Sequence, residues 1–303
     1  MVSELPASFA EAVKYARERE LMPTALGSAE IRELAAAVRQ RSLFMARVTN
    51  AEVLQELADQ IEALQQGRTN FATAMMKMRQ TIAEEGYNPR EGFPGDAERG
   101  VPPAEPFSLQ DVHSHSRTEL ALRTNLGQAY GFGQRQQGNE PDALYQFPCW
   151  ELVRVGTREV PRGYIQRKGK LVADPANKWT ERWLRAGGTI YGDERMVARK
   201  DDPVWKNLGS SEEFPDGLDN AYPPFAFNSG MGWLEIDREE SVALGIISED
   251  EIPMPDDGVR FAGPFDVNSD RFDPLLAAEL ARELQLRNRD TVAGLLAMME
   301  VTE

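Results

Sequence analysis

The sequence predicts a mixed α+β fold: a helical N-terminal region, a loop-rich mixed α/β domain with a small aromatic core, and a C-terminal helix. Apolar residues recur at helical spacing through roughly the first 90 residues, and a β-branched, alternating stretch follows Pro148. Aromatic residues concentrate between Trp150 and Trp233. At 303 residues the chain is long enough for about two domains of the usual ~150 residues.

The first region, residues 1–90, is expected to hold four helices. A capping-box pattern at Ser8 opens the first helix, and a longer one is expected over residues 28–47. Asn50 is expected to cap the third helix. The fourth carries three methionines and ends at Gly86, where glycine permits the C-terminal turn.

A linker is predicted next, over residues 86–106. This stretch holds five prolines and four glycines and shows no apolar periodicity. A further helix is expected to begin near Ser116, with Glu119 in the capping-box position.

The mixed domain is predicted over residues 107–262. "WELVRVGTREV" is expected to form a strand, and "NKWTERWLRAGG" a short helix that ends at its two glycines. Few periodic elements are expected between residues 190 and 262. A helical tail over residues 263–303 is predicted from Asp273 and Pro274, which form an N-cap and N1 pair.

Charge and composition narrow the function classes. The net charge of −15 opposes bulk binding to nucleic acid, although a basic stretch over residues 154–170 leaves a local contact with DNA open. The favoured interpretation of that stretch is a solvated basic strand face or a docking surface for an acidic partner. The single Cys149 excludes an intramolecular disulfide and indicates a reducing compartment, and no apolar run long enough for a membrane span occurs.

No catalytic, cofactor-binding or metal-binding residue is predicted, so the chain is expected not to be an enzyme. Asp111, His113 and His115 would share one face of a strand and could begin a metal site, but they lie beside a helix start, where capping is favoured. Cys149 lies between Pro148 and Trp150, a context typical of an inert buried thiol. No G-x-S-x-G nucleophile motif occurs.

Four segments, in order, resemble the phage Mu F-like minor head protein family, also called the phage head morphogenesis family. "RTELALRTNLGQAYGFGQ" resembles a helix of that family through Arg123, Thr124, Asn125 and Tyr130. "FPCWELVRVGTREVPR", "DDPVWKNLG" and "YPPFAFNSGMGW" are similar to its later aromatic and proline motifs. The resemblance covers roughly residues 107–247.

The chain also departs from the family pattern. "VPRGYIQRK" lacks the histidine that usually follows the arginine turn, and "NSGMGW" is not accompanied by the usual cysteine pair. Any site built from those residues in relatives is therefore absent here. The segment "NKWTERWLRAGG" also separates the two halves further than usual.

The segment "YPPFAFNSGMGW" is interpreted as structural rather than as a ligand pocket, because no converging charged residues accompany its aromatics. Folding back onto the earlier tryptophans would bury enough apolar area to offset much of the entropy of ordering the loop. The predicted aromatic core comprises Trp150, Trp205, Tyr222, Phe225, Phe227 and Trp233, with Trp179 and Trp183 beside them.

The resemblance implies a minor head protein of a tailed phage, prophage or phage-derived particle, assembled in the bacterial cytoplasm and built into the virion. It implies action in capsid assembly, and in DNA packaging or delivery near the portal. The expected partners are the portal protein and the major capsid or scaffolding protein, onto which the helical docking region 1–90 would bind, with no membrane. Two alternatives stay open: a metal-dependent hydrolase or nuclease-type cargo enzyme that uses Asp111, His113 and His115, and a host regulatory protein without a particle.

Overall fold

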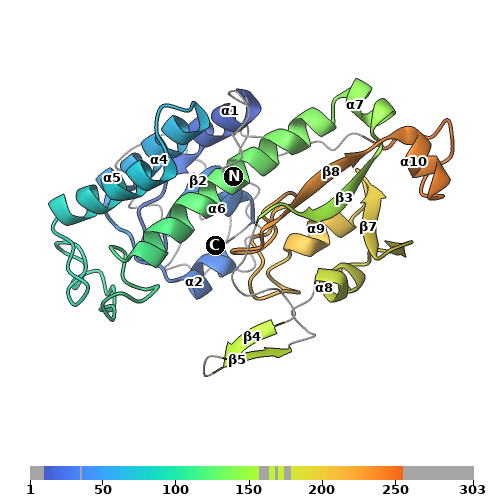
Figure 1. Cartoon of the computed structure of the whole chain (residues 1–303). Coiled ribbons are helices and arrows are strands. Elements are labelled where there is room, and N and C mark those ends of the chain that lie inside the picture. The colour runs from blue at the N-terminus through green and yellow to red at the C-terminus, as the bar shows by residue number, and fades with distance from the viewer. Residues whose placement is uncertain (1–9, 35, 157–163, 168–169, 174–178, 255–303) are drawn as a thin grey trace, which may run out of the picture. The chain divides into compact units, whose positions relative to one another are not determined.

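The structure is a computed structural model of the whole chain (Figure 1). It describes residues 10–34, 36–156, 164–167, 170–173 and 179–254. The chain forms two compact units, which are described separately. Within the described residues, unit 1 covers 13–125 and unit 2 covers 10–12 and 126–254. No helix in this part of the chain is both long and apolar enough to span a membrane.

Unit 1 is mainly helical. Its elements, with the boundary helices α1 and α6 included, are α1 (Ala10–Glu18), β1 (Glu20–Leu21), α2 (Ser28–Glu33), α3 (Ala36–Arg41), β2 (Ser42–Leu43), α4 (Ala51–Gln65), α5 (Phe71–Glu84) and the start of α6 (His115–Gly138). Strands β1 and β2 pair in parallel. Helices α4 and α5 pack side by side (Figure 1). Helices α1 and α6 each contribute residues to both units.

Helix α4 begins as the sequence predicts. The side chain of Asn50 accepts a hydrogen bond from the backbone N–H of Val53 (3.1 Å), which satisfies one of the free donors at the helix start. Asn70 caps α5 in the same way, through the N–H of Thr73 (2.9 Å). The chain turns at Gly67 and Gly86, which have φ angles of 65° and 75°.

The single helix expected over residues 28–47 is wrong. The backbone of Leu34 is extended, and two short helices, α2 and α3, take the place of one long helix. Ser42 and Leu43 then form strand β2, in which Leu43 is 1% exposed. Apolar periodicity did not reveal this break because Leu34 and Val38 still pack together with Met22.

Residues 86–106 belong to unit 1 together with the helices before and after them, so the expected boundary between residues 90 and 107 falls inside a unit. The segment is irregular but packed. Phe93 is 3% exposed, and the carboxylate of buried Asp96 accepts hydrogen bonds from the N–H of Phe93 and the hydroxyl of Thr49. Prolines and glycines here shape fixed turns and do not mark a spacer.

Unit 2 is built around a four-stranded antiparallel sheet with the order β6-β7-β3-β8. The strands are β3 (Cys149–Arg154), β6 (Ile190–Tyr191), β7 (Arg195–Arg199) and β8 (Met231–Ile236). Its helices are the end of α6, α7 (Pro141–Gln146), α8 (Trp179–Arg185), α9 (Val204–Gly209) and α10 (Arg238–Ala243). The mixed α+β class predicted from the sequence is confirmed.

Strands β7 and β8 lie in a region for which the sequence predicted few periodic elements. They flank β3 on either side, with Cys149 paired to Arg199 and to Ile236. Both faces of the sheet are covered: Cys149 and Ile236 pack with Val197 on one face, while Trp150 lies on the other. Strands buried on both faces lose the polar alternation on which sequence recognition depends.

Two predicted segments, the basic stretch and the C-terminal tail, lie partly or wholly outside the described residues. Strands β4 (Tyr164–Arg167) and β5 (Lys170–Ala173) pair antiparallel with each other, but the residues between and around them lie outside the described ones. The basic stretch 154–170 falls largely in this interval. The predicted tail over residues 263–303 also lies outside the described residues.

Candidate functional site

Three of the four segments that carry the family resemblance lie in unit 2, together with the end of the first segment, whose start lies in unit 1. They contribute the second half of α6, strand β3, helix α9 and the loop that leads into β8. Their shared feature is an aromatic cluster formed by Trp150, Trp183, Trp205, Phe225 and Trp233, each at most 6% exposed. Four of the six residues predicted for the aromatic core belong to this cluster, and Trp183, which the sequence places beside the core, lies within it.

Trp205, on α9, lies at the centre of the aromatic cluster. Its ring centroid is 5.3 Å from that of Trp183, 5.6 Å from that of Trp233, 5.9 Å from that of Trp150 and 6.3 Å from that of Phe225. Trp150 and Trp233 stack with centroids 3.9 Å apart and planes at 8°. Such edge and stacked contacts add to the stabilisation that area burial gives. The cluster therefore joins strands β3 and β8 to helices α8 and α9.

Three of the cluster's indole N–H groups have protein acceptors. Trp150 donates to Oε1 of Glu235 (2.9 Å), Trp183 to the carbonyl of Thr189 (2.7 Å), and Trp205 to the carbonyl of Arg199 (2.7 Å). The indole Nε1 of Trp233 has no hydrogen-bond partner among the described residues. Three satisfied donors out of four are typical of a packed interior, which suits a structural core.

The loop before β8 packs against α6. Tyr222 is fully buried, and its ring meets that of Phe132 edge-on at 5.8 Å. Gly131 lies under Pro223 so closely that a Cβ there would come 1.7 Å from the Pro223 carbonyl oxygen. Tyr222 therefore belongs to the α6 contact and Phe225 to the aromatic cluster. This close approach requires a glycine at position 131.

Phe227 does not belong to the aromatic core, contrary to the sequence prediction. Its side chain is 43% exposed, whereas Phe225, two residues earlier, is fully buried. The N–H of Phe227 bonds to the carbonyl of Asp216, and the next residue, Asn228, has a positive φ of 51°. The chain turns at this point before entering β8, which directs Phe227 away from the aromatic cluster.

The family-motif residues of α6 divide between the units. Arg123 is exposed, pairs with Glu119 (2.8 Å) and lies over the ring of Phe71. Asn125 is buried in unit 1, and its Oδ1 accepts a hydrogen bond from Nη1 of Arg19 (2.8 Å). Thr124 is half-buried beside them, and Tyr130 lies in unit 2.

Arg19 and Asn125 form a buried polar pair in unit 1. The remaining guanidinium nitrogens of Arg19 donate to the carbonyl of Ser42, at 3.0 and 2.6 Å. The amide Nδ2 of Asn125 donates to the carbonyl of Ala121 (2.9 Å). All of these partners belong to unit 1, so Asn125 joins α6 to the β1–β2 region.

Asp111, His113 and His115 are not brought together as a ligand set. The two carboxylate oxygens of buried Asp111 accept hydrogen bonds from the N–H groups of Phe107 (2.8 Å) and His113 (3.0 Å). His115 is exposed and lies 3.9 Å from Glu119. Within the described residues, no group of three or more His, Cys, Asp or Glu side chains is arranged to hold a metal ion.

Lys200 is a buried cation that sequence reasoning missed. Its Nζ donates to the carbonyls of Gly138 (3.0 Å) and Ala143 (3.3 Å), pairs with Glu235 (2.8 Å) and lies 5.2 Å from the Trp150 ring. Burial lowers the pKa of Lys200, and Glu235 opposes that shift. The ammonium group thereby joins the C-terminal carbonyl of α6 to the sheet.

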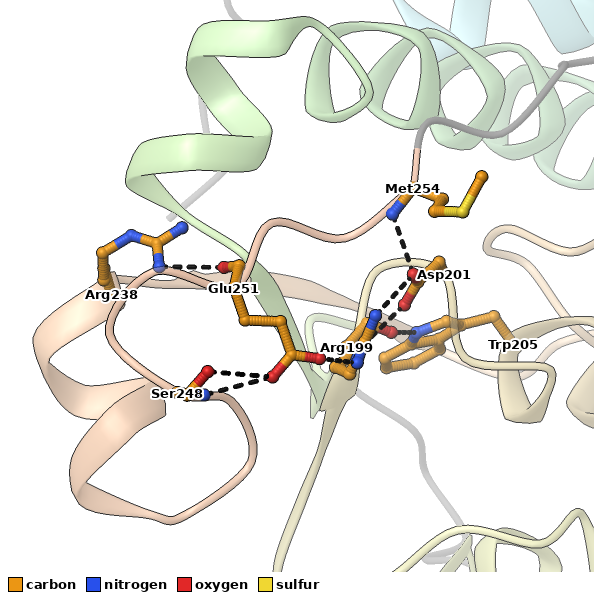
Figure 2. Close-up of polar contacts among 7 residues, drawn as sticks. All are labelled: Arg199, Asp201, Trp205, Arg238, Ser248, Glu251 and Met254. Atoms are coloured by element: carbon orange, nitrogen blue, oxygen red, sulfur yellow. Dashed lines mark hydrogen bonds and ion pairs between the residues drawn. The ribbon is translucent and has the colours of Figure 1, made fainter.

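A second missed feature is the arginine–carboxylate network of Arg199, Asp201, Arg238 and Glu251 (Figure 2). Asp201 receives two hydrogen bonds from Arg199 (2.9 and 2.8 Å) and one from the N–H of Met254 (2.8 Å). Arg199 also pairs with Glu251. Burial acts to raise the pKa of Asp201, but the hydrogen bonds from Arg199 and Met254 outweigh it and hold that pKa below its ordinary value.

Arg238 completes the network from α10. Its Nη1 donates to the carbonyls of Glu249 (2.8 Å) and Glu251 (2.9 Å), and its Nε donates to the carbonyl of Tyr145 (2.7 Å). Residues 248–254 are thus held against β7 as an ordered strap (Figure 2). Arg199 and Met254 are 55 positions apart in the sequence, so no local pattern could have predicted the network.

Cys149 is fully buried on strand β3. Burial raises the pKa of its thiol, and a hydrogen bond with Ser241 opposes this shift. A thiol with a raised pKa and no access to solvent is a poor nucleophile. Its environment agrees with the structural role that the sequence predicted.

Comparison with known proteins provides no relative. No protein-family model matches the chain, and neither curated proteins nor solved structures give a significant match.

Proposed function

We propose that the chain is a structural subunit of a phage or phage-derived particle, of the minor head protein type. The observation that supports this proposal is that the three later resembling segments pack together in unit 2, with the end of the first segment against them. They lie apart in the sequence, yet α6, β3, α9 and the β8 loop share one set of packing contacts. Motifs that are weak one by one gain weight when they build a single core.

The chemistry of unit 2 supports a structural role. The described cations among the core elements are engaged by the protein itself: Lys200 by two carbonyls and Glu235, and Arg182 by Asp216 and the carbonyl of Leu208. Such internal pairing fixes the backbone between short elements. It is what a subunit needs when loops, rather than long helices, make up much of its domain.

The cargo-enzyme alternative depends on Asp111, His113 and His115. Both oxygens of Asp111 are used by backbone N–H groups, and His115 is exposed, 3.9 Å from Glu119. These contacts favour a loop-shaping role for Asp111.

The test is incorporation of the chain into particles. Particles would be induced in the cell that encodes the gene, purified through two density gradients, and digested for mass spectrometry. We expect the chain to co-purify at a fixed ratio to the portal protein, and gene deletion to leave heads unassembled or empty. Normal particles from the deletion strain, or a chain that remains entirely outside the particle fraction, would refute the proposal.

A matched pair of variants separates folding from incorporation. Phe225→Ala should reduce the amount of folded chain and the number of particles together, because Phe225 is fully buried. Phe227→Ala removes the same ring from a half-exposed position and should leave the amount of folded chain unchanged. Loss of particles without loss of folded chain in the Phe225→Ala strain would instead identify a binding surface.

A further inference from the structure

Unit 1 presents a large aromatic side chain to solvent on a loop that is held rigidly from below. Phe107 is 88% exposed, and Leu109, two residues further, is 52% exposed. Phe107 also has a positive φ of 66°. A bulky side chain adopts this backbone region at a cost in free energy, and such strain persists where the surrounding structure enforces it.

Polar contacts enforce this conformation. The N–H of Phe107 donates to Oδ2 of Asp111 (2.8 Å), and the hydroxyl of Ser114 donates to the carbonyl of Ser108 (2.7 Å). The hydroxyl of Ser108 in turn accepts a hydrogen bond from the N–H of Asp111 (3.3 Å). The loop is thus closed on itself around the buried carboxylate of Asp111.

The base of the loop is fixed to the helical part of unit 1. Tyr87 accepts a hydrogen bond from the N–H of Val112 (3.0 Å), and Val112 is 2% exposed. From α5, Nε of Arg79 donates to the carbonyl of His113 (3.1 Å). The fold therefore secures every part of the loop except the two apolar side chains, which contribute little packing to unit 1.

From these contacts we infer that Phe107 and Leu109, here called the apolar loop tip, insert into an apolar pocket with a basic rim on a different protein. A preorganised aromatic residue loses little conformational entropy on binding, which is the property of an interface hot spot. The inference does not depend on the proposed particle role, because any protein partner with such a pocket would satisfy it.

Charge selects this class of partner over the others. Glu105, two residues before Phe107, is exposed, and the whole chain carries a net charge of −15. Anionic lipid surfaces and nucleic acid repel such a chain, and so does a second copy of it. A pocket surrounded by lysine or arginine complements both the apolar tip and its acidic flank.

The first step of the test is site-specific photocross-linking with the full-length chain in the cell that encodes it. Phe107→p-benzoylphenylalanine keeps an aromatic ring at the tip. We expect one discrete product with a different protein, whose cross-linked residue lies in an apolar pocket bordered by lysine or arginine. The same replacement at Leu184, an apolar residue of α8 that is 51% exposed, is the control and should give no such product.

The second step uses the purified chain and the purified cross-linked protein. Phe107→Ala should raise the dissociation constant at least about 30-fold, and Leu109→Ala should raise it several-fold. Leu184→Ala should change it less than about twofold. Glu105→Gln should weaken binding less than Phe107→Ala does, and high salt should remove the effect of Glu105→Gln, because salt screens the charge of the parent glutamate. The melting temperature of each variant should stay within about 2 °C of the parent.

Several results would overturn the inference. These are a cross-linked product with a second copy of the chain or with lipid, the same product from position 184, or no product at position 107. An unchanged dissociation constant for Phe107→Ala would do so as well. A partner that has no place in a particle would leave this inference standing while arguing against the proposed function.

Discussion

Two irregular segments rich in proline and glycine differ in where they place their aromatic side chains. The segment 222–233 buries Tyr222, Phe225 and Trp233, and only Phe227 emerges from it. The segment 86–114 buries Phe93 but leaves Phe107 at 88% exposure. Composition is similar in the two segments, so it does not distinguish a structural loop from a presenting loop.

The difference lies in what holds each backbone. In segment 222–233, ring packing does so: Phe225 and Trp233 contact Trp205, and Pro223 lies against Gly131. In segment 86–114, buried carboxylates do so: Asp96 and Asp111 accept backbone N–H groups. A loop held by its own aromatics must bury them, whereas a loop held by carboxylates can present an aromatic to a partner.

The largest expected effect comes from removing a ring on which the first segment depends. Phe225→Ala should lower the free energy of unfolding by about 3–5 kcal/mol, the usual cost of a cavity left by a buried aromatic. All five tryptophans lie in unit 2, so tryptophan fluorescence during urea unfolding reports that unit. Phe227→Ala is the control and should cost less than about 0.5 kcal/mol. Equal losses for both variants would contradict the assignment.

Sequence reasoning predicted the parts of the molecule that rest on local patterns. Asn50 and the helix after it followed from capping and periodicity, and the aromatic core followed from composition. Strand β8 was not predicted, because buried apolar residues lie on both of its faces, Trp233 on one and Ile236 on the other, and the preceding prolines suggested a loop. The arginine–carboxylate network was also missed, since Arg199 and Glu251 are brought together by the fold alone.

The exposure of Phe107 illustrates the same limit from the opposite direction. The sequence shows an apolar residue after Pro106, and such a residue is usually buried. Its positive φ and the capture of its N–H by Asp111 are not visible in the sequence. From the sequence alone, residues 86–116 therefore indicate only a linker followed by a helix start.

The second-largest effect is expected from crowding the same proline segment. Gly131→Ala should cost about 3 kcal/mol, because the new Cβ would meet the backbone carbonyl of Pro223, which cannot rotate away. At Gly127, one turn earlier, an added Cβ would contact only the Pro224 side chain, 3.2 Å from its Cδ. Gly127→Ala should therefore be nearly neutral, since alanine favours the helix by about 1 kcal/mol. Fluorescence-detected unfolding of the two variants gives the comparison, and a destabilised Gly127→Ala with an unaffected Gly131→Ala would reverse our account.

Removing the carboxylate that holds the second segment should have a smaller effect. Asp111→Ala leaves the N–H groups of Phe107 and His113 without their acceptor and should cost about 2 kcal/mol. Because unit 1 contains no tryptophan, far-UV circular dichroism is the appropriate signal. Glu105→Ala removes an exposed carboxylate nearby and should change stability by less than about 0.5 kcal/mol. If the two variants unfold alike, the carboxylate of Asp111 does not hold the loop.

Acid should act on the strap of unit 2 through Asp201. Since the folded-state pKa of Asp201 is depressed, the stability it contributes is present above its unfolded pKa of about 4 and is lost as pH falls through the folded value. We expect Asp201→Asn to reduce the loss of stability below about pH 4 and to lower stability at pH 7 by about 1 kcal/mol at most. Urea unfolding at pH 7, 4 and 3 measures both quantities. A variant with the parent's full acid dependence would show that other carboxylates account for it.

The smallest expected effect concerns the side chain that contrasts most with Phe225. Phe107→Ala should change the free energy of unfolding by no more than about 0.5 kcal/mol, because a ring that is 88% exposed contributes little packing and alanine keeps the same requirement for a positive φ. Phe107→Gly should stabilise unit 1 modestly, since glycine adopts that φ without strain. Circular dichroism measures both variants, and a loss approaching that of Phe225→Ala would mean that the ring packs within the chain. A gain in stability for Phe107→Gly would show that the phenylalanine costs the fold free energy at this position, as expected of a residue that acts on a partner.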